Sequence, residues 1–483
     1  MVAYVPPKQA GKYKAVASGA ITNGKPVIVN ADGTVGSITS SNAVTVFDSG
    51  SIKNTAIATN GSGTVLIVYR DEDDSGKGKA IAGTISNGEI TYGSEAIFEA
   101  GAVVGGHIYT TAVVYDASNS KFVILYCDDD NSDYPTAIVA TVSGTSISFG
   151  TAVVIGSNAC VDIEGTYDST AEKIVVAYYG GSTPYLTGIV GTVSGTDISF
   201  GSASTLASKS PFGIEVAYDS NANKSVVVYR DNGGTNNGFA LVATVSGTSI
   251  SASGDTNFTS STAQQFGIAF DSSANKLVIV FMDQGDSLKH KAVVATVSGT
   301  SISFGSISEV NIASYSTDNK VVYDSVNNKH IITCDVADAN LTRVIATVSG
   351  TSLSYDTAVT LLSGNKQHIK TAYDSGNDTA VIALRDTTNS GRGTSILAGS
   401  GTYSATSTNL TSENYIGIAS GGTYADTAEA TIDVVGTVNK DQSGLTAGQT
   451  YYVQTDGTLG TSADSPSVVA GTAISATEII VKG

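Results

Sequence analysis

A stretch of about fifty residues recurs along this chain, and this recurrence restricts the folds that the chain can adopt. It is clearest where AYDSNANKSVVVYRD is followed by LVATVSGTSIS. An Asp that ends the first strand-like run marks the register of the units; it falls at Asp116, Asp168, Asp219, Asp271, Asp324 and Asp374, with Thr59 at the matching place in the first unit. A unit of this size cannot bury its own apolar face, so it must stack on copies of itself.

Each unit contains four strand-like runs, as in GIAFD, KLVIVF, KAVVATVSG and TSISFG, which we term A, B, C and D. The runs are rich in Val, Ile, Thr and Tyr, and residues that tolerate tight hairpins separate A from B and C from D. Periods of about 40 to 50 residues built from short strands are typical of propeller blades. The sequence therefore predicts an all-β chain in which residues 43–404 form a seven-bladed β-propeller.

The last unit lacks a D strand, because SILAGSG is followed by YSATSTN rather than by a strand-like run. A D-like run stands instead before the first A strand, and we expect residues 43–49 to supply the missing strand and close the ring. Residues 1–42 and 405–483 then leave the ring at the same blade. Both segments contain a strand that enters an Asp-Gly turn, at Asp32 and Asp456, and we expect them to build one small β domain together.

Composition excludes several classes of partner. The formal net charge of −18 would repel a nucleic-acid backbone. The chain has no apolar run of membrane-spanning length, and its N-terminus lacks the apolar core of a signal peptide, so we expect a soluble protein made in a cytoplasm, with no membrane insertion. Cys127, Cys160 and Cys334 have no metal-ligand spacing, and their odd number makes a disulfide framework improbable, so we expect buried or half-buried thiols.

The C-terminal residues resemble a known class of protein. Residues 446–459 (TAGQTYYVQTDGTL) and 468–482 (VVAGTAISATEIIVK), together with the SGTSISFG repeats, resemble virion structural proteins of tailed bacteriophages, particularly marine ones, including tail-fibre-like proteins. The resemblance implies a place in the virion, contacts with other virion proteins and a symmetric homo-oligomer. It brings no catalytic residue with it.

Comparison of the units with one another separates two faces of the predicted ring. The A–B and C–D turns are nearly repeated, whereas the B–C loops differ, at residues 71–77, 128–135, 180–186, 231–237, 283–290, 335–341 and 386–392. Loops on a rigid scaffold are common binding sites, so the B–C face is the candidate receptor-binding surface. Its candidate anchors are Tyr134, Tyr185, Phe239 and His290. The alternative is that these loops vary because nothing constrains them.

Two further groups of residues could carry chemistry. Asp71, Asp73 and Ser75 alternate before a Gly, as in a short Ca²⁺-binding loop, although the acidic residue of a complete loop is missing; the alternative is a solvated acidic hairpin tip. Four positions before each marker residue stand Thr55, Ala112, Glu164, Glu215, Gly267, Lys320 and Lys370. Two adjacent glutamates could form an acid/base pair. The alternative is a wet channel mouth in which lysines compensate the charge.

These observations predict a non-enzymatic bacteriophage virion protein of tail-fibre or appendage type. Its terminal β domain would dock on other virion proteins, and its propeller would attach to a glycan or protein of the host surface. A capsid or tail decoration protein that binds no receptor is the first alternative, and a carbohydrate-active enzyme is the second. No cofactor is expected apart from the candidate Ca²⁺.

Overall fold

The computed structural model describes residues 11–30, 32–38, 40–42, 44–86, 88–105, 110–180, 185–312, 318–336, 340–400, 406–455, 457–463 and 466–482. By its internal contacts the chain divides into two compact units, one formed by residues 43–405 and the other by residues 1–42 with 406–483. In the described ranges there is no helix with the length and apolar character needed to cross a membrane.

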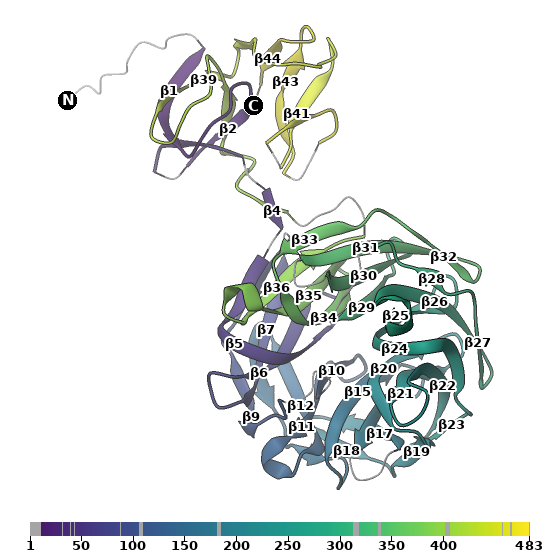
Figure 1. Cartoon of the computed structure of the whole chain (residues 1–483). Coiled ribbons are helices and arrows are strands. Elements are labelled where there is room, and N and C mark those ends of the chain that lie inside the picture. The colour runs from purple at the N-terminus through teal and green to yellow at the C-terminus, as the bar shows by residue number, and fades with distance from the viewer. Residues whose placement is uncertain are drawn as a thin grey trace. The chain divides into compact units, whose positions relative to one another are not determined.

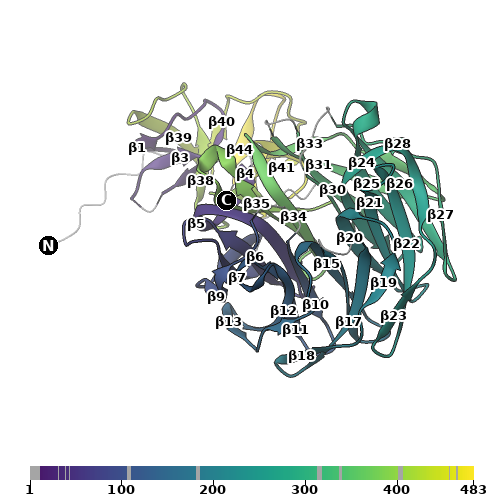
Figure 2. The ribbon, with the colours of Figure 1, turned by 60° about the horizontal axis from the view of Figure 1, so that its bottom comes forward.

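The larger unit consists of antiparallel sheets set around a central axis, and the colour runs around that axis from purple at β5 through teal to green at β36 (Figures 1 and 2). The prediction of an all-β propeller is confirmed. Two five-stranded sheets contain β10 (Thr111–Asp116), β11 (Lys121–Asp128), β12 (Tyr134–Ser143), β13 (Ser146–Phe149) and β14 (Val153–Val154), and then β15 (Cys160–Asp168), β16 (Lys173–Gly180), β17 (Leu186–Ser194), β18 (Asp197–Phe200) and β19 (Ser204–Ala207).

Three further sheets follow along the chain. A nine-stranded sheet contains β20 (Pro211–Asp219), β21 (Lys224–Asp231), β22 (Asn237–Ser246), β23 (Ser249–Ala252), β24 (Thr256–Asp271), β25 (Lys276–Asp283), β26 (Lys289–Ser298), β27 (Ser301–Phe304) and β28 (Ser308–Glu309). The next sheet contains β29 (Asn319–Asp324), β30 (Lys329–Val336), β31 (Asn340–Ser349), β32 (Ser352–Tyr355) and β33 (Val359–Ser363). The last combines β34 (Lys366–Asp374), β35 (Thr379–Asp386) and β36 (Arg392–Ala398) with β5 (Val44–Thr59), β6 (Thr64–Asp71), β7 (Lys77–Ser86), β8 (Glu89–Tyr92) and β9 (Ala96–Ala102).

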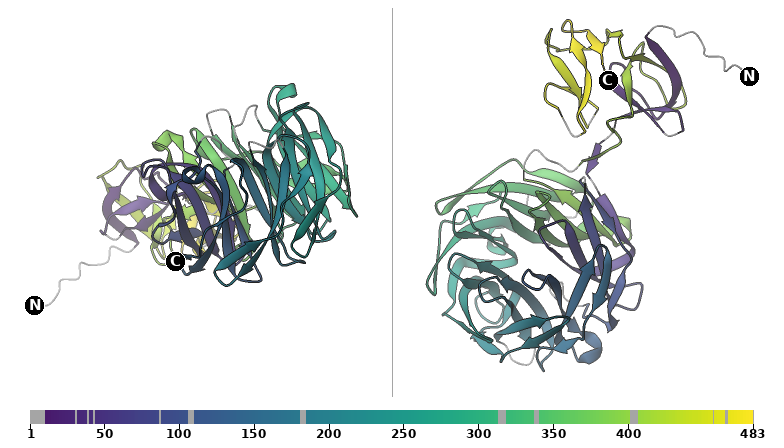
Figure 3. Two further views of the ribbon diagram at one scale, coloured as in Figure 1. Left: turned by 90° about the horizontal axis from the view of Figure 1, so that it is seen from below. Right: turned by 180° about the vertical axis from the view of Figure 1, so that it is seen from behind.

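Strand β5 joins the beginning of the propeller to its end. Its first half pairs with β36, from Val44 opposite Ile396 to Ser51 opposite Arg392, and its second half pairs with β6. The purple and green ends of the ring consequently lie side by side (Figure 3). The outer edge of β36 is thus covered by a strand from the N-terminal side of the ring, which is the segment that the missing D strand of the last unit requires.

The repeated Asp of each A–B turn is a structural residue. Asp219 accepts hydrogen bonds at Oδ1 from the backbone amides of Asn221 and Ala222, at 3.0 and 2.8 Å, and Asn223 then adopts a positive φ of 54°. Asp168, Asp271 and Asp324 make the same pair of bonds. Neighbouring sheets also meet at these turns, since the Tyr218 hydroxyl donates to the Thr170 hydroxyl at 2.7 Å. The A–B turns are therefore nearly identical because their residues stabilise the fold.

In the first repeat unit the register differs by one residue from the one predicted above. Asn60, and not Thr59, plays the part of the repeated Asp, because its Oδ1 accepts the amides of Ser62 and Thr64, both at 2.9 Å. The sequence comparison missed this because the turn GSGT departs from the consensus. Four positions before Asn60 stands Ala56, so Ala56 replaces Thr55 in the set of residues that shares one height with Glu164 and Glu215.

Apolar side chains of successive sheets form the core. Tyr69, Tyr126 and Tyr229 on the B strands are fully buried in this core. The cysteines differ from the prediction, because Cys127 and Cys160 form a disulfide while only Cys334 is a buried free thiol. They lie 33 residues apart in sequence but on strands of successive sheets, β11 and β15, with their Cα atoms 5.5 Å apart. An odd count could not reveal this proximity.

His330 on β30 makes the stability of the propeller sensitive to acid. Its side chain is fully buried, and burial lowers its pKa from 6.5 to about 4, against the weaker opposing effect of Asp271. Between these two pKa values the unfolded chain binds the proton and the folded chain does not, so stability is lost as the pH falls from 6.5 toward 4. In His330→Leu we expect this loss to be shallower by up to about 1.4 kcal/mol per pH unit, measured by urea unfolding at pH 8, 6, 5 and 4. Parallel profiles for the two proteins would contradict the prediction.

The smaller unit is built from both ends of the chain. A closed barrel contains β1 (Lys12–Ser18), β3 (Val35–Ser37), β2 (Pro26–Val29), β38 (Tyr415–Ala419) and β39 (Glu429–Val434), and a second sheet contains β40 (Val438–Asn439), β44 (Ile479–Val481), β43 (Val468–Ala473), β41 (Thr450–Val453) and β42 (Leu459–Gly460). Residues 12–16 of β1 pair antiparallel with residues 429–433 of β39, and β4 (Ser40–Asn42) pairs with β37 (Thr406–Thr408). Ile28 and Val453 belong to one shared apolar cluster, so the two ends share a core.

Candidate functional site

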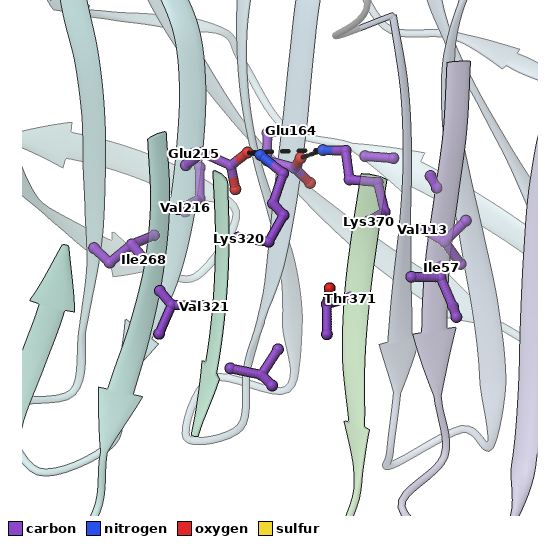
Figure 4. A pocket seen from close by; sticks show the side chains of 14 residues that line it. Ile57, Val113, Glu164, Glu215, Val216, Ile268, Lys320, Val321, Lys370 and Thr371 are labelled. Carbon is purple, nitrogen blue, oxygen red and sulfur yellow. Dashed lines mark hydrogen bonds and ion pairs between the residues drawn. The ribbon is translucent and has the colours of Figure 1, made fainter. Parts of the chain in front are cut away.

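A cavity of about 160 Å³ lies on the axis of the propeller (Figure 4). It is lined at one height by a residue of each A strand, namely Ala56, Ala112, Glu164, Glu215, Gly267, Lys320 and Lys370. The charged members come from β15, β20, β29 and β34 and point toward one another. The structure therefore brings together the two glutamates and two lysines that the repeat analysis placed at one height.

The four charges compensate one another in pairs. The Lys320 Nζ lies 2.6 Å from the Glu215 carboxylate, and the Lys370 Nζ lies 3.1 Å from Glu164 and 3.7 Å from Glu215. Burial raises the pKa of Glu164, and Lys370 opposes this rise. Burial disfavours the Lys370 ammonium as well, but the carboxylates of Glu164 and Glu215 outweigh burial and raise its pKa. This arrangement fits the compensated channel better than a pair of carboxyls that share a proton.

Two aspartates next to the charged residues of the cavity form hydrogen bonds to neighbouring A strands, and they were not predicted as site residues. Asp162 lies two residues before Glu164, and Asp318 lies two residues before Lys320. Asp162 Oδ2 accepts the amides of Gly213 and Ile214 on the neighbouring strand, at 2.6 and 3.0 Å, and Asp318 Oδ2 accepts the amide of Ile369 at 3.1 Å. Burial raises the pKa of Asp162 well above its usual value and that of Asp318 to about 7.

The contact of Asp162 with the amides of Gly213 and Ile214 depends on a β-bulge in β20. The pairing of β20 with β21 shifts register between Phe212 and Glu215, and Gly213 within the bulge has a φ of +69°. A bulge turns successive amides toward the same side, where one carboxylate can accept both. The Asp at position 162 and the Gly at position 213 are the only sequence signals of this contact, and without the register of the strands they could not be paired.

The four predicted receptor anchors have different environments. Tyr185 is 41% exposed, and Tyr134 is half-buried at the start of β12. Phe239 and His290 were wrongly predicted to be exposed, since their side chains are buried at 8% and 1% exposure. Both stand inside a C strand rather than on the loop before it, so the alternation of the strand turns them inward.

The buried pair have structural partners. Phe239 stacks on Tyr229 with ring centroids 6.0 Å apart, and the Lys209 ammonium lies over the Phe239 ring, 3.2 Å from its centroid. His290 Nδ1 lies 2.7 Å from the Asn319 side-chain oxygen. These contacts explain both residues through packing, and they leave Tyr134 and Tyr185 as the anchors with exposed surface.

Four of the B–C loops share a backbone frame although their side chains differ. In each of them a Ser with φ between 57° and 60° is followed by a second residue with positive φ; the pairs are Ser75–Gly76, Ser132–Asp133, Ser287–Leu288 and Ser390–Gly391. Three contain a short 3-10 turn before this Ser, η1 (Asp129–Asn131), η2 (Gln284–Asp286) and η3 (Thr387–Asn389). In these four loops the variation therefore lies in side chains carried on a common backbone support. The B–C loop tips at 181–184 and 337–339 lie outside the described residues.

The predicted Ca²⁺ loop contains an internal cation instead. Asp71 is buried, and its Oδ2 lies 2.7 Å from the Lys79 Nζ, which also lies 2.8 Å from Glu95. Asp73 points elsewhere, since its Oδ2 accepts the amide of Ser51 at 2.9 Å. Asp71 and Asp73 do not form a common ligand set with Ser75, and Lys79 already supplies the positive charge beside Asp71.

Comparison with known proteins gives structural similarity only. No protein-family model and no curated protein matches the chain. Among solved structures, AofleA from Arthrobotrys oligospora aligns with a TM-score of 0.44 and 12% identity over 70% of this chain and 93% of its own. A leech intramolecular trans-sialidase aligns at 0.44 and 11% over 74% of this chain and 70% of its own. The lectin of Aleuria aurantia, a six-bladed β-propeller, aligns at 0.38 and 13% over 64% and 96%.

Proposed function

We propose that the chain is a non-enzymatic bacteriophage virion protein of tail-fibre or appendage type, which displays a propeller for attachment to a glycan or protein of the host surface. In this proposal the propeller has seven blades, with the nine- and eight-stranded sheets each divided into two blades at β24 and β5. The smaller unit is the module that docks on other virion proteins, in a symmetric assembly. Its residues 446–459 and 468–482 carry the resemblance to phage structural proteins.

The observation that carries the attachment role is the unequal use of the two sets of turns. The repeated residues of the A–B turns make hydrogen bonds within the turn, as Asp219 does, or to a neighbouring sheet, as Tyr218 does. Four of the B–C loops have a common backbone frame, yet the tips of three of them carry different residues, Asp129–Asn131, Gln284–Asp286 and Thr387–Asn389. A fixed frame with variable tips is suited to recognition, because the scaffold orders the loops before binding.

The non-enzymatic part of the proposal rests on the axial cavity. A general acid must keep its proton and a general base must lose it, so the two groups need different pKa values. Glu164 and Glu215 instead each pair with a lysine ammonium within 3.1 Å. Lysines 320 and 370 are bound in the same pairs. The cavity therefore offers a substrate no free charged group among the residues that line it.

Exchange of loop tips tests the attachment role. Because η1, η2 and η3 precede the same pair of positive-φ positions, replacing residues 129–131 by Thr-Thr-Asn and Gln284 by Thr keeps the frame and changes only the tips. Gly285 is kept, because a Cβ there would lie 2.8 Å from the Ser261 Cβ. We expect this variant, carrying in addition Tyr185→Ser, to lose at least tenfold in binding to host cells and to a printed glycan array. The unfolding midpoint should move little, since the replaced side chains are exposed.

Asn221→Thr, on an exposed turn of the opposite face, is the matched control and should bind as the unmodified protein does. Unchanged binding by the folded tip variant would refute attachment through these loops. That result would favour the alternative of a decoration or assembly protein, in which the ring packs on capsid or tail neighbours. Turnover of a polysaccharide that is lost in Glu164→Gln would instead favour a carbohydrate-active enzyme.

A further inference from the structure

The residue before the last of the B strand is an arginine in three repeat units, namely Arg70, Arg230 and Arg385. The residue two positions further along the chain meets the guanidinium in two of these units. In the first unit this residue is Glu72, and it forms an ion pair with Arg70. In the fourth unit it is Asn232, whose side-chain oxygen accepts a hydrogen bond from Arg230 at 2.8 Å. The same position of the seventh unit is therefore where a partner for Arg385 is expected.

Arg385 has no carboxylate partner among the described residues. The expected position holds Thr387, whose hydroxyl donates to the Asn365 carbonyl at 2.8 Å. The Arg385 guanidinium instead donates to the Gln367 side-chain oxygen at 2.9 Å and lies 3.5 Å from the Ser51 hydroxyl. Both of these partners are neutral, so the positive charge of Arg385 is not compensated by direct contact.

Two further cations lie near Arg385 and share a single carboxylate. Lys53 stands opposite Arg70 in the pairing of β5 with β6, and its Nζ lies 3.0 Å from the Glu72 carboxylate that also binds Arg70. Burial, and then the charges of Arg385 and Arg70, lower the pKa of Lys53. Three cations thus meet one paired carboxylate, which leaves an excess of positive charge in a chain whose net charge is −18.

The nearby titratable groups do not remove this excess. Burial, and then the charges of Arg385 and Lys53, lower the pKa of His368 to about 3, so this imidazole is neutral at physiological pH. Because both cations act on the same imidazole, they belong to one small region. Asp73 is exposed, and its Oδ2 accepts the amide of Ser51 at 2.9 Å rather than a hydrogen bond from Arg385.

We propose that Arg385 and Lys53 bind the carboxylate or sulfate group of an acidic saccharide on the host surface. This inference rests on the proposed attachment function and names the class of its ligand. Arg385 precedes a B–C loop and Lys53 lies in β5 opposite the end of β6, so both belong to the candidate receptor-binding face. A guanidinium binds such anionic groups through parallel N–H donors, and the ammonium adds a second charge. The neutral polar side chains of Ser51, Gln367 and Thr387 suit the hydroxyl groups of a saccharide.

Binding of the full chain to a printed array of saccharides tests the proposal. On this array each saccharide with a carboxylate or sulfate stands beside its carboxyl-reduced or desulfated counterpart. We expect binding to the acidic members only, weakening at least threefold between about 0.05 and about 0.5 M NaCl, because salt screens exposed charges. Arg385→Gln and Lys53→Gln should each lose at least tenfold in affinity.

Thr387 offers a sharper pair of variants. Thr387→Glu gives Arg385 the carboxylate that Glu72 gives Arg70, so it should bind at least tenfold more weakly than Thr387→Gln, which changes the same position without charge. This pair keeps the test decisive if Arg385→Gln folds poorly. Lys121→Gln, which removes a cation at an A–B turn, is the control for net charge and should bind as the unmodified chain does.

The results also separate this inference from the attachment function. If host cells are bound but no acidic saccharide is, or if the neutral counterparts are bound equally well, the inference is overturned and the attachment function stands. Equal binding by folded Thr387→Glu and Thr387→Gln overturns the inference as well. If neither host cells nor any saccharide is bound, both proposals fail.

Discussion

Replacing Lys370 by Met is expected to lower the free energy of unfolding by about 3 to 5 kcal/mol at neutral pH, as breaking a buried ion pair usually does. Lys370 lies 3.1 Å from Glu164 and 3.7 Å from Glu215, and the side chains of Lys370 and Glu164 are only 13% and 14% exposed. Without the ammonium, Glu164 has no ion-pair partner among the described residues and remains a poorly solvated carboxylate. Urea unfolding of the full chain, followed by fluorescence and circular dichroism, measures the loss.

The pH dependence and a double variant identify the cause. In Lys370→Met the folded pKa of Glu164 should rise further above its unfolded value, because burial is no longer opposed. The folded state then binds the additional proton, so the deficit should shrink as the pH falls from 7 to 5. Adding Glu164→Gln should restore most of the stability at pH 7, since removal of both charges is often nearly neutral. A deficit that is the same at both pH values and in the double variant would show that lost packing, not charge, is responsible.

The sequence was sufficient for the propeller because its repeat is legible in short-range signals. Strand-like runs such as KLVIVF and turns such as Ser-Gly-Thr-Ser depend on local residue preferences. In the structure KLVIVF lies in β25, and the Ser-Gly-Thr-Ser turns connect C strands to D strands. The register failed where local signals failed, in the first unit, where Asn60 replaces the repeated Asp. The predicted register of this unit was therefore shifted by one residue, and Thr55 was predicted in place of Ala56 among the residues that line the axial cavity. A shift of one residue matters because alternate residues of a strand face opposite sides of the sheet.

The site was only partly predictable, because its essential contacts cross between sheets. Equal spacing from the repeated Asp was enough to place Glu164, Glu215, Lys320 and Lys370 at one height, but not to pair each carboxylate with its lysine. Phe239 and His290 were misplaced because the C strand begins at Asn237 and at Lys289, earlier than loop composition suggests. The disulfide between Cys127 and Cys160 depends on the packing of β11 against β15, which a separation of 33 residues does not encode.

The largest effect outside the axis is expected at the glycine of the ISFG repeat, which brings successive sheets into close contact. A Cβ on Gly150 would lie 1.8 Å from the Thr196 carbonyl oxygen of the next C–D turn, and a Cβ on Gly201 would lie 1.9 Å from that of Thr248. Backbone atoms cannot swing aside as a flexible side chain can, so the sheets must separate. Gly201→Ala is therefore expected to lower the free energy of unfolding by about 1 to 3 kcal/mol.

A second substitution at Gly150 should add to the first, because the two contacts lie between different pairs of sheets. Gly254→Ala is the matched control, since a Cβ there meets no atom within 4 Å and its φ is not positive. Its exposed position in a D strand region of the same kind makes the backbone entropy change comparable. If Gly201→Ala unfolds at the same urea concentration as Gly254→Ala, the close approach does not hold the sheets together, and the repeated glycine must be explained by the turn alone.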